Sequence, residues 1–148
     1  MKPRAAWPIL AKKAKDQCDQ AMAALVKGRE KINNLEQSRN RMEVLHADYL
    51  ARSLEAEKNT QSMSANVNFR GFLQQIQSLI DRVNIDLQHA SHELEVLKTK
   101  LMAAEKKRIQ METLHEQDVR RVRAAAAKRE QHAMDAAGVM LYNMKSLH

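Results

Sequence analysis

The feature that most constrains the fold is a run of apolar residues spaced alternately three and four apart between residues 73 and 104. All ten positions of this run are apolar: Leu73, Ile76, Ile80, Val83, Leu87, Ala90, Leu94, Leu97, Leu101 and Ala104. Such a spacing, sustained over this length, forms one narrow apolar seam along a helix, which is the pattern of a coiled coil. The second half of the chain therefore needs another helix that presents a matching seam.

A matching seam lies upstream, between Ala11 and Tyr49. Ten of its twelve positions are apolar or small, and the exceptions are Arg39 and His46. The stretch between the two seams is rich in Asn and Ser, whose side chains compete for the hydrogen bonds of a helix. One short interruption between two long helices favours antiparallel neighbours. The sequence therefore predicts an all-α fold, a long antiparallel two-helix coiled coil or helical hairpin.

The predicted boundaries make the second helix longer than the first. We expect a single coiled-coil domain over residues 1–148, with helix 1 at about 9–57, a loop at about 58–67 and helix 2 at about 68–145. Proline is tolerated in a first helical turn, so helix 1 should start at or just after Pro8. Ser64 or Asn66 could cap helix 2.

Composition agrees with this prediction. Only 3% of the 148 residues are aromatic, which is too few to fill an ordinary globular core. Three glycines and two prolines leave little turn chemistry for a fold of many strands. These counts favour long helices over a β fold or a compact globular domain.

The register of the hairpin follows from the position of its turn. A turn centred near Gln61 pairs residues whose numbers sum to about 122, so Gly28 should face Leu94 and Leu25 should face Leu97. A register one heptad away would also keep the seams together. Residues after about His115 then have no partner within the chain, and an overhang of ~30 residues would be ~45 Å of single helix. Such a helix frays, self-associates or is completed by a partner.

Charge is concentrated in two segments of the chain, whose net charge is +7. Residues 1–31 hold eight basic and three acidic side chains, and residues 106–130 hold eight basic and four acidic ones. Antiparallel helices bring these segments to the same end, which favours a partner with an acidic or phosphate-bearing surface. No specific nucleic-acid binding is expected, because the basic stretch follows the zipper instead of preceding it and aromatics for base stacking are scarce.

An apolar flank is expected near the loop. Leu45, Phe72 and Leu79 lie beside the seam, close to Tyr49 and Phe69. Apolar side chains next to an already apolar seam leave a partly exposed patch, and such patches mark protein contacts. A wider seam, or a third helix that packs there in an oligomer, would explain the same pattern.

Residue patterns for catalysis are lacking, and we expect no enzyme activity, cofactor or metal. The three glycines are isolated, so there is no phosphate-binding loop. His89 and His92 are three residues apart, but both fall on outer positions without further ligands. The single cysteine, Cys18, reads as a small seam residue and needs no oxidising compartment. No segment resembles a membrane span or a secretory signal.

Several features resemble the FliJ family. They are the segment Asn-Phe-Arg-Gly-Phe-Leu-Gln-Gln-Ile-Gln-Ser-Leu-Ile at residues 68–80, Tyr49 with Leu45 four residues earlier, the basic first helix and the total length. The resemblance implies a cytoplasmic stalk of the bacterial flagellar type III export apparatus, peripheral at the inner membrane through its partners. It also implies three partners: the FliI-like export ATPase hexamer, whose assembly and ATP hydrolysis it promotes, the cytoplasmic domain of the FlhA-like export gate, and export chaperones.

The resemblance also implies the location of the gate-binding surface. Its residues would be Ser38, Met42, Leu45, Tyr49, Phe72, Ile76, Leu79 and Val83. Leu45, Ser38 and Val83 depart from the residue types that the family can have there. Candidates for contact with the ATPase ring come from charge alone, and they are Lys12, Lys13, Lys15, Arg120, Arg121 and Arg123. The alternatives are the equivalent stalk of a virulence type III secretion system and a generic coiled-coil scaffold or chaperone.

Overall fold

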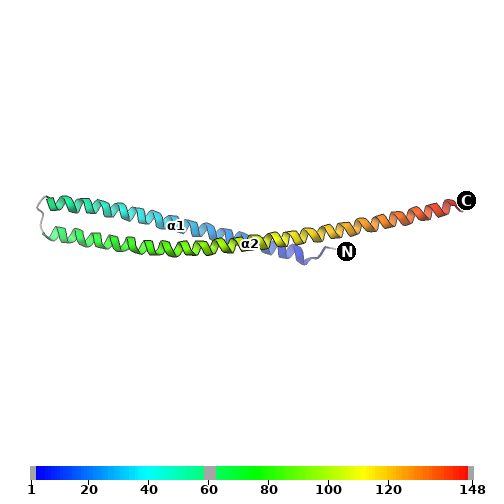
Figure 1. Cartoon of the computed structure of the whole chain (residues 1–148), viewed down its shortest axis with the longest axis horizontal. Helices are drawn as coiled ribbons and strands as arrows, with labels where there is room; N and C mark the ends of the chain where they lie inside the picture. Colours follow the sequence, from blue (N-terminus) through cyan, green and yellow to red (C-terminus); the bar gives the residue numbers. More distant parts are fainter. Residues whose placement is uncertain (1–2, 59–62, 147–148) are drawn as a thin grey trace. The chain divides into compact units, whose positions relative to one another are not determined.

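The computed structural model describes residues 3–58 and 63–146, and these residues form two long helices. Helix α1 spans Ala6–Lys58 and helix α2 spans Met63–Ser146 (Figure 1). The predicted all-α hairpin with a longer second helix is confirmed. The predicted turn centre, Gln61, lies outside the described residues.

Both helices begin earlier than the sequence predicted. Helix α1 starts at Ala6, so Pro8 lies within its first turn, where a missing backbone N–H costs little. The Trp7 backbone N–H donates to the Arg4 carbonyl oxygen at 3.2 Å and closes the turn that precedes the helix.

Helix α2 starts at Met63, so Asn66 lies inside it and not at its N-cap. The predicted loop at 58–67 was therefore too long. Asn and Ser lower helix propensity by only fractions of a kcal/mol per residue, a preference that the packing of a long helix overrides.

The chain divides into two compact units. Unit 2 comprises residues 21–101, and unit 1 comprises residues 1–20 and 102–148. In unit 2, α1 and α2 run antiparallel and bury a core of seam residues, namely Leu25, Ala56, Ile76, Ile80, Val83, Ala90 and Leu101. Burial of each leucine or isoleucine side chain stabilises the pair by about 1.5–3 kcal/mol.

The register of unit 2 is visible at Gly28. A methyl group placed on this residue would lie 3.0 Å from Leu97 Cδ1 and 3.3 Å from Leu94 Cδ1. The predicted contact of Gly28 with Leu94 is thus confirmed. Lys31 pairs with Glu93 at 3.6 Å beside it. The absence of a side chain at Gly28 makes room for two leucines of the opposite helix, which sets the spacing of the helices there.

Unit 1 has a thinner core than unit 2. Its buried residues are the small Ala14 and Cys18, which confirms Cys18 as a seam residue, and the acidic Asp118. The expected end of pairing near His115 was too early, because the Arg4 backbone N–H donates to Asp118 Oδ2 at 2.7 Å. The earlier start of α1 and the residues before it account for this extension.

Beyond this contact, α2 continues without burial. Every residue from Ala126 to Ser146 is exposed. These 21 residues correspond to about 30 Å of helix. Within residues 3–58 and 63–146, neither helix has a stretch long and apolar enough to cross a membrane.

Candidate interaction sites

Three aromatic rings gather in unit 2, where α1 ends and α2 begins. The rings of Tyr49 and Phe72 stack with centroids 5.1 Å apart and an interplanar angle of 21°. Phe69 lies 6.3 Å from Tyr49 in a tilted arrangement, and the Arg52 guanidinium carbon lies 5.7 Å from the centre of the Tyr49 ring. Offset and tilted aromatic pairs are each worth about 0.5–1.5 kcal/mol, so this cluster joins α1 to α2.

The aromatic cluster is open to solvent on one side. Tyr49, Asn68, Phe69 and Phe72 line a shallow hollow of about 260 Å³. The side chains predicted to form the apolar flank remain exposed, with 43% for Leu45, 49% for Phe72 and 53% for Leu79. Large apolar groups that stay this exposed beside a rigid aromatic cluster form a surface suited to a protein partner.

The structure sorts the residues predicted for gate binding into three groups by their exposure. Ile76 and Val83 are buried in the seam, with 3% and 8% exposure, so they support the surface from below. Ser38, Met42 and Tyr49 are half-buried. Leu45, Phe72 and Leu79 are the members most available to a partner.

Sequence reasoning assigned no binding role to Asn68 or Arg52, and it placed Phe69 near the apolar flank without including it among the gate-binding residues, although all three line or flank the same hollow. The spacing of Phe69 three residues before Phe72 was the available signal for this ring, because residues three apart share a helix face. Arg52 lies three residues after Tyr49 in the same way. His89 and His92 are exposed on the outside of α2.

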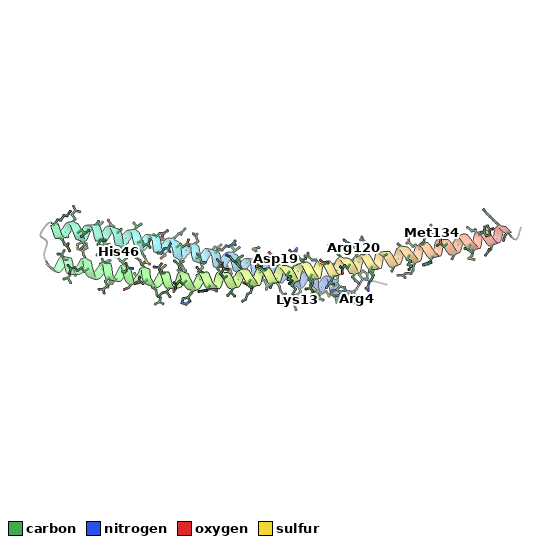
Figure 2. All side chains as sticks on the ribbon, viewed as in Figure 1. Arg4, Lys13, Asp19, His46, Arg120 and Met134 are labelled. Atoms are coloured by element: carbon green, nitrogen blue, oxygen red, sulfur yellow. The ribbon has the colours of Figure 1, made fainter. Side chains whose placement is uncertain are left out.

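The basic candidates for the ATPase contact all lie in unit 1. This unit holds fourteen basic and eight acidic residues, and unit 2 holds eleven and ten. Lys12, Lys13, Lys15 and Arg123 are exposed (Figure 2 labels Lys13). Most of the excess positive charge therefore belongs to unit 1, on side chains that solvent reaches.

The six candidates occupy two different levels of unit 1. The contact between Arg4 and Asp118 fixes the register there, so Lys12–Lys15 lie opposite residues near 107–110 of α2. At that level α2 carries the exposed Lys107 and the half-buried Arg108, and the exposed Lys106 lies next to them. Sequence reasoning selected none of the three for the ATPase contact. The group at 120–123 lies farther along α2, near the start of α1.

Two of the candidate arginines already have partners within unit 1. Arg120 pairs with Glu116 at 4.0 Å, but its side chain is 80% exposed, so this pair is weak. Arg121 Nη2 donates to Asp118 Oδ1 at 2.7 Å, and the Arg121 side chain keeps 54% of its exposure. Arg121 therefore makes a contact within the fold and still exposes about half of its side chain to solvent.

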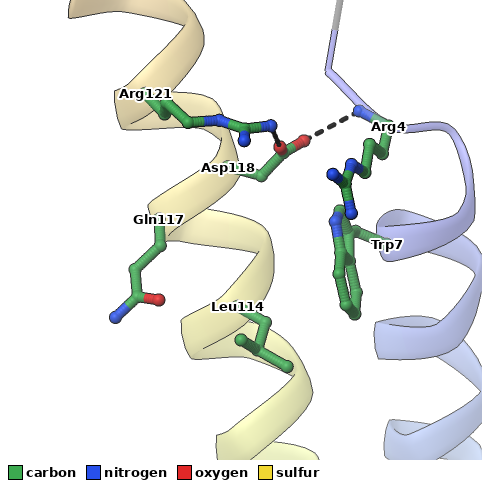
Figure 3. Close-up of a pocket in the computed structure, with 6 residues that line it drawn as sticks. All are labelled: Arg4, Trp7, Leu114, Gln117, Asp118 and Arg121. Carbon is green, nitrogen blue, oxygen red and sulfur yellow. Dashed lines mark hydrogen bonds and ion pairs between the residues drawn. The ribbon is translucent and has the colours of Figure 1, made fainter.

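The carboxylate of Asp118 connects the two helices at this point (Figure 3). One oxygen accepts from the Arg4 backbone and the other from Arg121. The hydrogen bond from the Arg4 backbone lowers the pKa of Asp118 below its ordinary value of 3.8, burial opposes this shift, and Arg121 adds to it. The first turn of α1 contains no acidic residue, so Asp118 supplies from α2 the negative charge that a helix N-terminus favours.

A second polar contact crosses unit 1 at Cys18. Arg108 falls on the seam, donates to both carboxylate oxygens of Glu112 at 3.2 and 3.3 Å, and approaches the Cys18 thiol. Glu112 and then Cys18 raise the pKa of Arg108 above its ordinary value. Arg108 is accommodated on the seam because its guanidinium reaches out and pairs with the carboxylate of Glu112.

These observations define the class of protein. Two long antiparallel helices carry an exposed apolar aromatic surface in one unit and exposed basic side chains in the other, so the chain is a coiled-coil protein. The family model described as flagellar FliJ protein matches residues 9–146. The chain belongs to the FliJ family, which associates it with flagellar type III export. No curated protein and no solved structure matches the chain.

Proposed function

We propose that this protein is a cytoplasmic, non-enzymatic stalk of the flagellar type III export apparatus. In this proposal unit 1 enters the ring of the export ATPase and promotes its assembly and ATP hydrolysis. The aromatic surface of unit 2 binds the cytoplasmic domain of the export gate, and the protein also engages export chaperones. These partners would hold it at the cytoplasmic face of the inner membrane.

The proposed insertion into the ATPase ring is supported above all by the exposed end of α2. Val139, Met140, Leu141 and Tyr142 are consecutive and remain 59–74% exposed. Consecutive helical residues point 100° apart, so four of them place apolar groups on all sides of the helix. A helix that is apolar all round is normally enclosed. A ring that surrounds the helix satisfies this requirement better than a flat surface does.

The gate part is supported by the exposed flank. Phe72 and Leu79 lie seven residues apart on α2 and therefore on one face, with about half of each side chain exposed. The stacked Tyr49 ring holds Phe72 in place at the start of that face. Aromatic anchors held rigidly in this way dominate the binding energy of many interfaces.

The ATPase part is tested by adding the purified full-length protein to its cognate export ATPase. We expect a higher rate of ATP hydrolysis and a larger fraction of hexamers in sedimentation. A variant truncated after Glu130 should lose most of the stimulation, because it removes the segment that is apolar all round. An unchanged rate with the intact protein would refute the stalk role.

The gate part is tested by replacing Phe72 and Leu79 with alanine together. Binding to the purified gate domain should weaken by about 30–900-fold, since the two anchors contribute about 1–2 kcal/mol each. The matched control replaces Ile85 and Val96, which are equally exposed at 51% and 53% on α2 in the same unit. Equal weakening by both pairs, with circular dichroism unchanged, would argue against the proposed surface.

A generic scaffold that dimerises through α2 is the second candidate function, because the exposed residues 126–146 also fit a second helix. Sedimentation of the free protein distinguishes the two: a stable dimer at micromolar concentration favours the scaffold. The stalk of a virulence type III secretion system would differ in the ATPase that it stimulates, so both ATPases belong in the assay.

A further inference from the structure

The region where α1 begins contains a small pocket, and of its lining residues only Arg121 is also a candidate for the ATPase contact. Its volume is about 210 Å³, and it is lined by Arg4, Trp7, Leu114, Gln117, Asp118 and Arg121, all of unit 1. Figure 3 shows the Arg4 side chain running alongside the indole of Trp7, with Asp118 and Arg121 across from them on α2. The half-buried Trp7 and Leu114 supply apolar walls.

Hydrogen-bond donors exceed acceptors in this pocket. Asp118 is the one carboxylate among the six lining residues, and both of its oxygens already accept, from the Arg4 backbone and from Arg121. Within the described part of the chain, the Arg4 guanidinium and the Trp7 indole N–H have no hydrogen-bonded partner, and the Gln117 amide points away from both of them (Figure 3). The lining residues carry two positive charges and one negative charge.

This arrangement calls for an acceptor that carries negative charge and stands next to an apolar group. A guanidinium pairs with a carboxylate through parallel hydrogen bonds, and such charged bonds are about twice as strong as neutral ones. The Trp7 and Leu114 side chains would meet the apolar part of the same ligand. The surplus of positive charge on unit 1 would draw an acidic partner toward the pocket.

We propose that the pocket between the start of α1 and the Asp118 turn of α2 binds an acidic side chain, flanked by an apolar residue, from a partner protein. Arg4 is the principal contact and Trp7 the apolar wall. This inference does not depend on the proposed function, because it states which chemistry reaches the pocket and not which protein carries it. Its test can therefore succeed or fail separately from the ATPase and gate assays.

The experiment uses the full-length protein and its own tryptophan as the reporter. Trp7 is the only tryptophan, so fluorescence reports on this pocket alone. The probe is a capped five-residue peptide of alternating glutamate and leucine, titrated near physiological salt. The matched probe has glutamine in place of glutamate. We expect a saturable change of emission with the glutamate peptide and none with the glutamine peptide over the same range.

Arg4→Gln removes the guanidinium but keeps the backbone N–H that Asp118 accepts, so the fold of this region should persist. We expect this variant to bind the glutamate peptide with about tenfold lower affinity, which is the effect of losing one charged hydrogen bond. Arg82→Gln is the control, because it removes the same charge from an exposed side chain of unit 2, and the affinity of this variant for the peptide should stay within about twofold of the wild type.

The proposal would be overturned by no saturable signal with the wild-type protein, by equal weakening in Arg82→Gln, or by equal binding of the two peptides. A single-stranded thymidine oligonucleotide serves as the competing probe. Tighter binding of this oligonucleotide than of the peptide, with the same dependence on Arg4, would replace the acidic partner protein with a nucleic acid. The shift of the Trp7 indole N–H signal in NMR provides a second readout that helix fraying would not reproduce.

Discussion

At the scale of single residues, the most informative side chain is a carboxylate on the seam. Asp118 falls where a coiled coil would place an apolar residue, and by itself it suggests the end of the pairing. In the structure it accepts from the backbone of Arg4 and from Arg121. A buried carboxylate is tolerated here because each of its oxygens has a donor.

The first prediction concerns acid stability at this residue. The folded state lowers the pKa of Asp118, so this contact stabilises the fold above about pH 3.8, and the contribution is lost as pH falls through the lowered pKa. Fluorescence of Trp7, which lines the same pocket, should therefore change during acidification. Asp118→Asn should reduce the amplitude of this change and lower stability at neutral pH. A full-sized acid transition in Asp118→Asn would show that another group is responsible.

The second prediction compares two glycines on helices. A methyl group at Gly71, which lies on α2 in unit 2 like Gly28 on α1, meets no atom within 4 Å, so Gly71→Ala should gain the full helix propensity of about 1 kcal/mol. At Gly28 the same methyl group would crowd Leu97 and Leu94. Gly28→Ala should therefore gain less, and Gly28→Val should be destabilising. Thermal denaturation followed by circular dichroism measures the stability of each variant. Equal gains in stability at the two glycines would contradict the close packing of Gly28.

At the scale of elements, α2 changes character along its length. Between residues 66 and 101 it buries one seam against α1, and from Ala126 to Ser146 it buries nothing. Packing supplies most of the stability of a helix in water, and propensity supplies little. The alanines at 124–127 keep the propensity high where packing stops.

The third prediction follows from this difference. Backbone amides of residues 126–146 should exchange with deuterium much faster than those of the 73–101 region, because they open by local fraying. Hydrogen exchange with mass spectrometry measures this, and binding of the export ATPase should slow exchange in the C-terminal segment. Equal protection in both segments of the free protein would indicate self-association, which sedimentation would detect.

At the scale of the whole molecule, the two units differ in chemistry. Unit 2 carries the exposed aromatic surface and almost balanced charges, and unit 1 carries the basic surface and the exposed end of α2. The proposed binding of the two units to different partners should therefore be separable by mutation. Distant sites without shared contacts usually give additive effects.

The fourth prediction tests this separation. The Phe72 and Leu79 double alanine variant should lose gate binding but keep its stimulation of the ATPase within about twofold. A variant with Lys12, Lys13 and Lys15 replaced by glutamine should do the reverse, and its effect should shrink as salt is raised. Loss of both activities in either variant, with helicity unchanged, would show that the two surfaces serve one partner.

The sequence by itself determined the fold class and the longer second helix, and it limited the partner of Gly28 to Leu94 or a position one heptad away, between which the structure decided. Heptad spacing is a local pattern, and an antiparallel hairpin has few other ways to bury it. The location of the aromatic cluster followed for the same reason, since Tyr49 and Phe72 lie at matching distances from the turn.

Tertiary structure decided what depends on side-chain partners across the helices. It showed that Ile76 and Val83 are core and that Leu45, Phe72 and Leu79 are surface, because their burial depends on the approach of the opposite helix. It also joined Arg4 to Asp118, residues 114 positions apart. A seam pattern describes one helix at a time, so a carboxylate that breaks it gains its role only when the backbone of the other helix lies within hydrogen-bond reach.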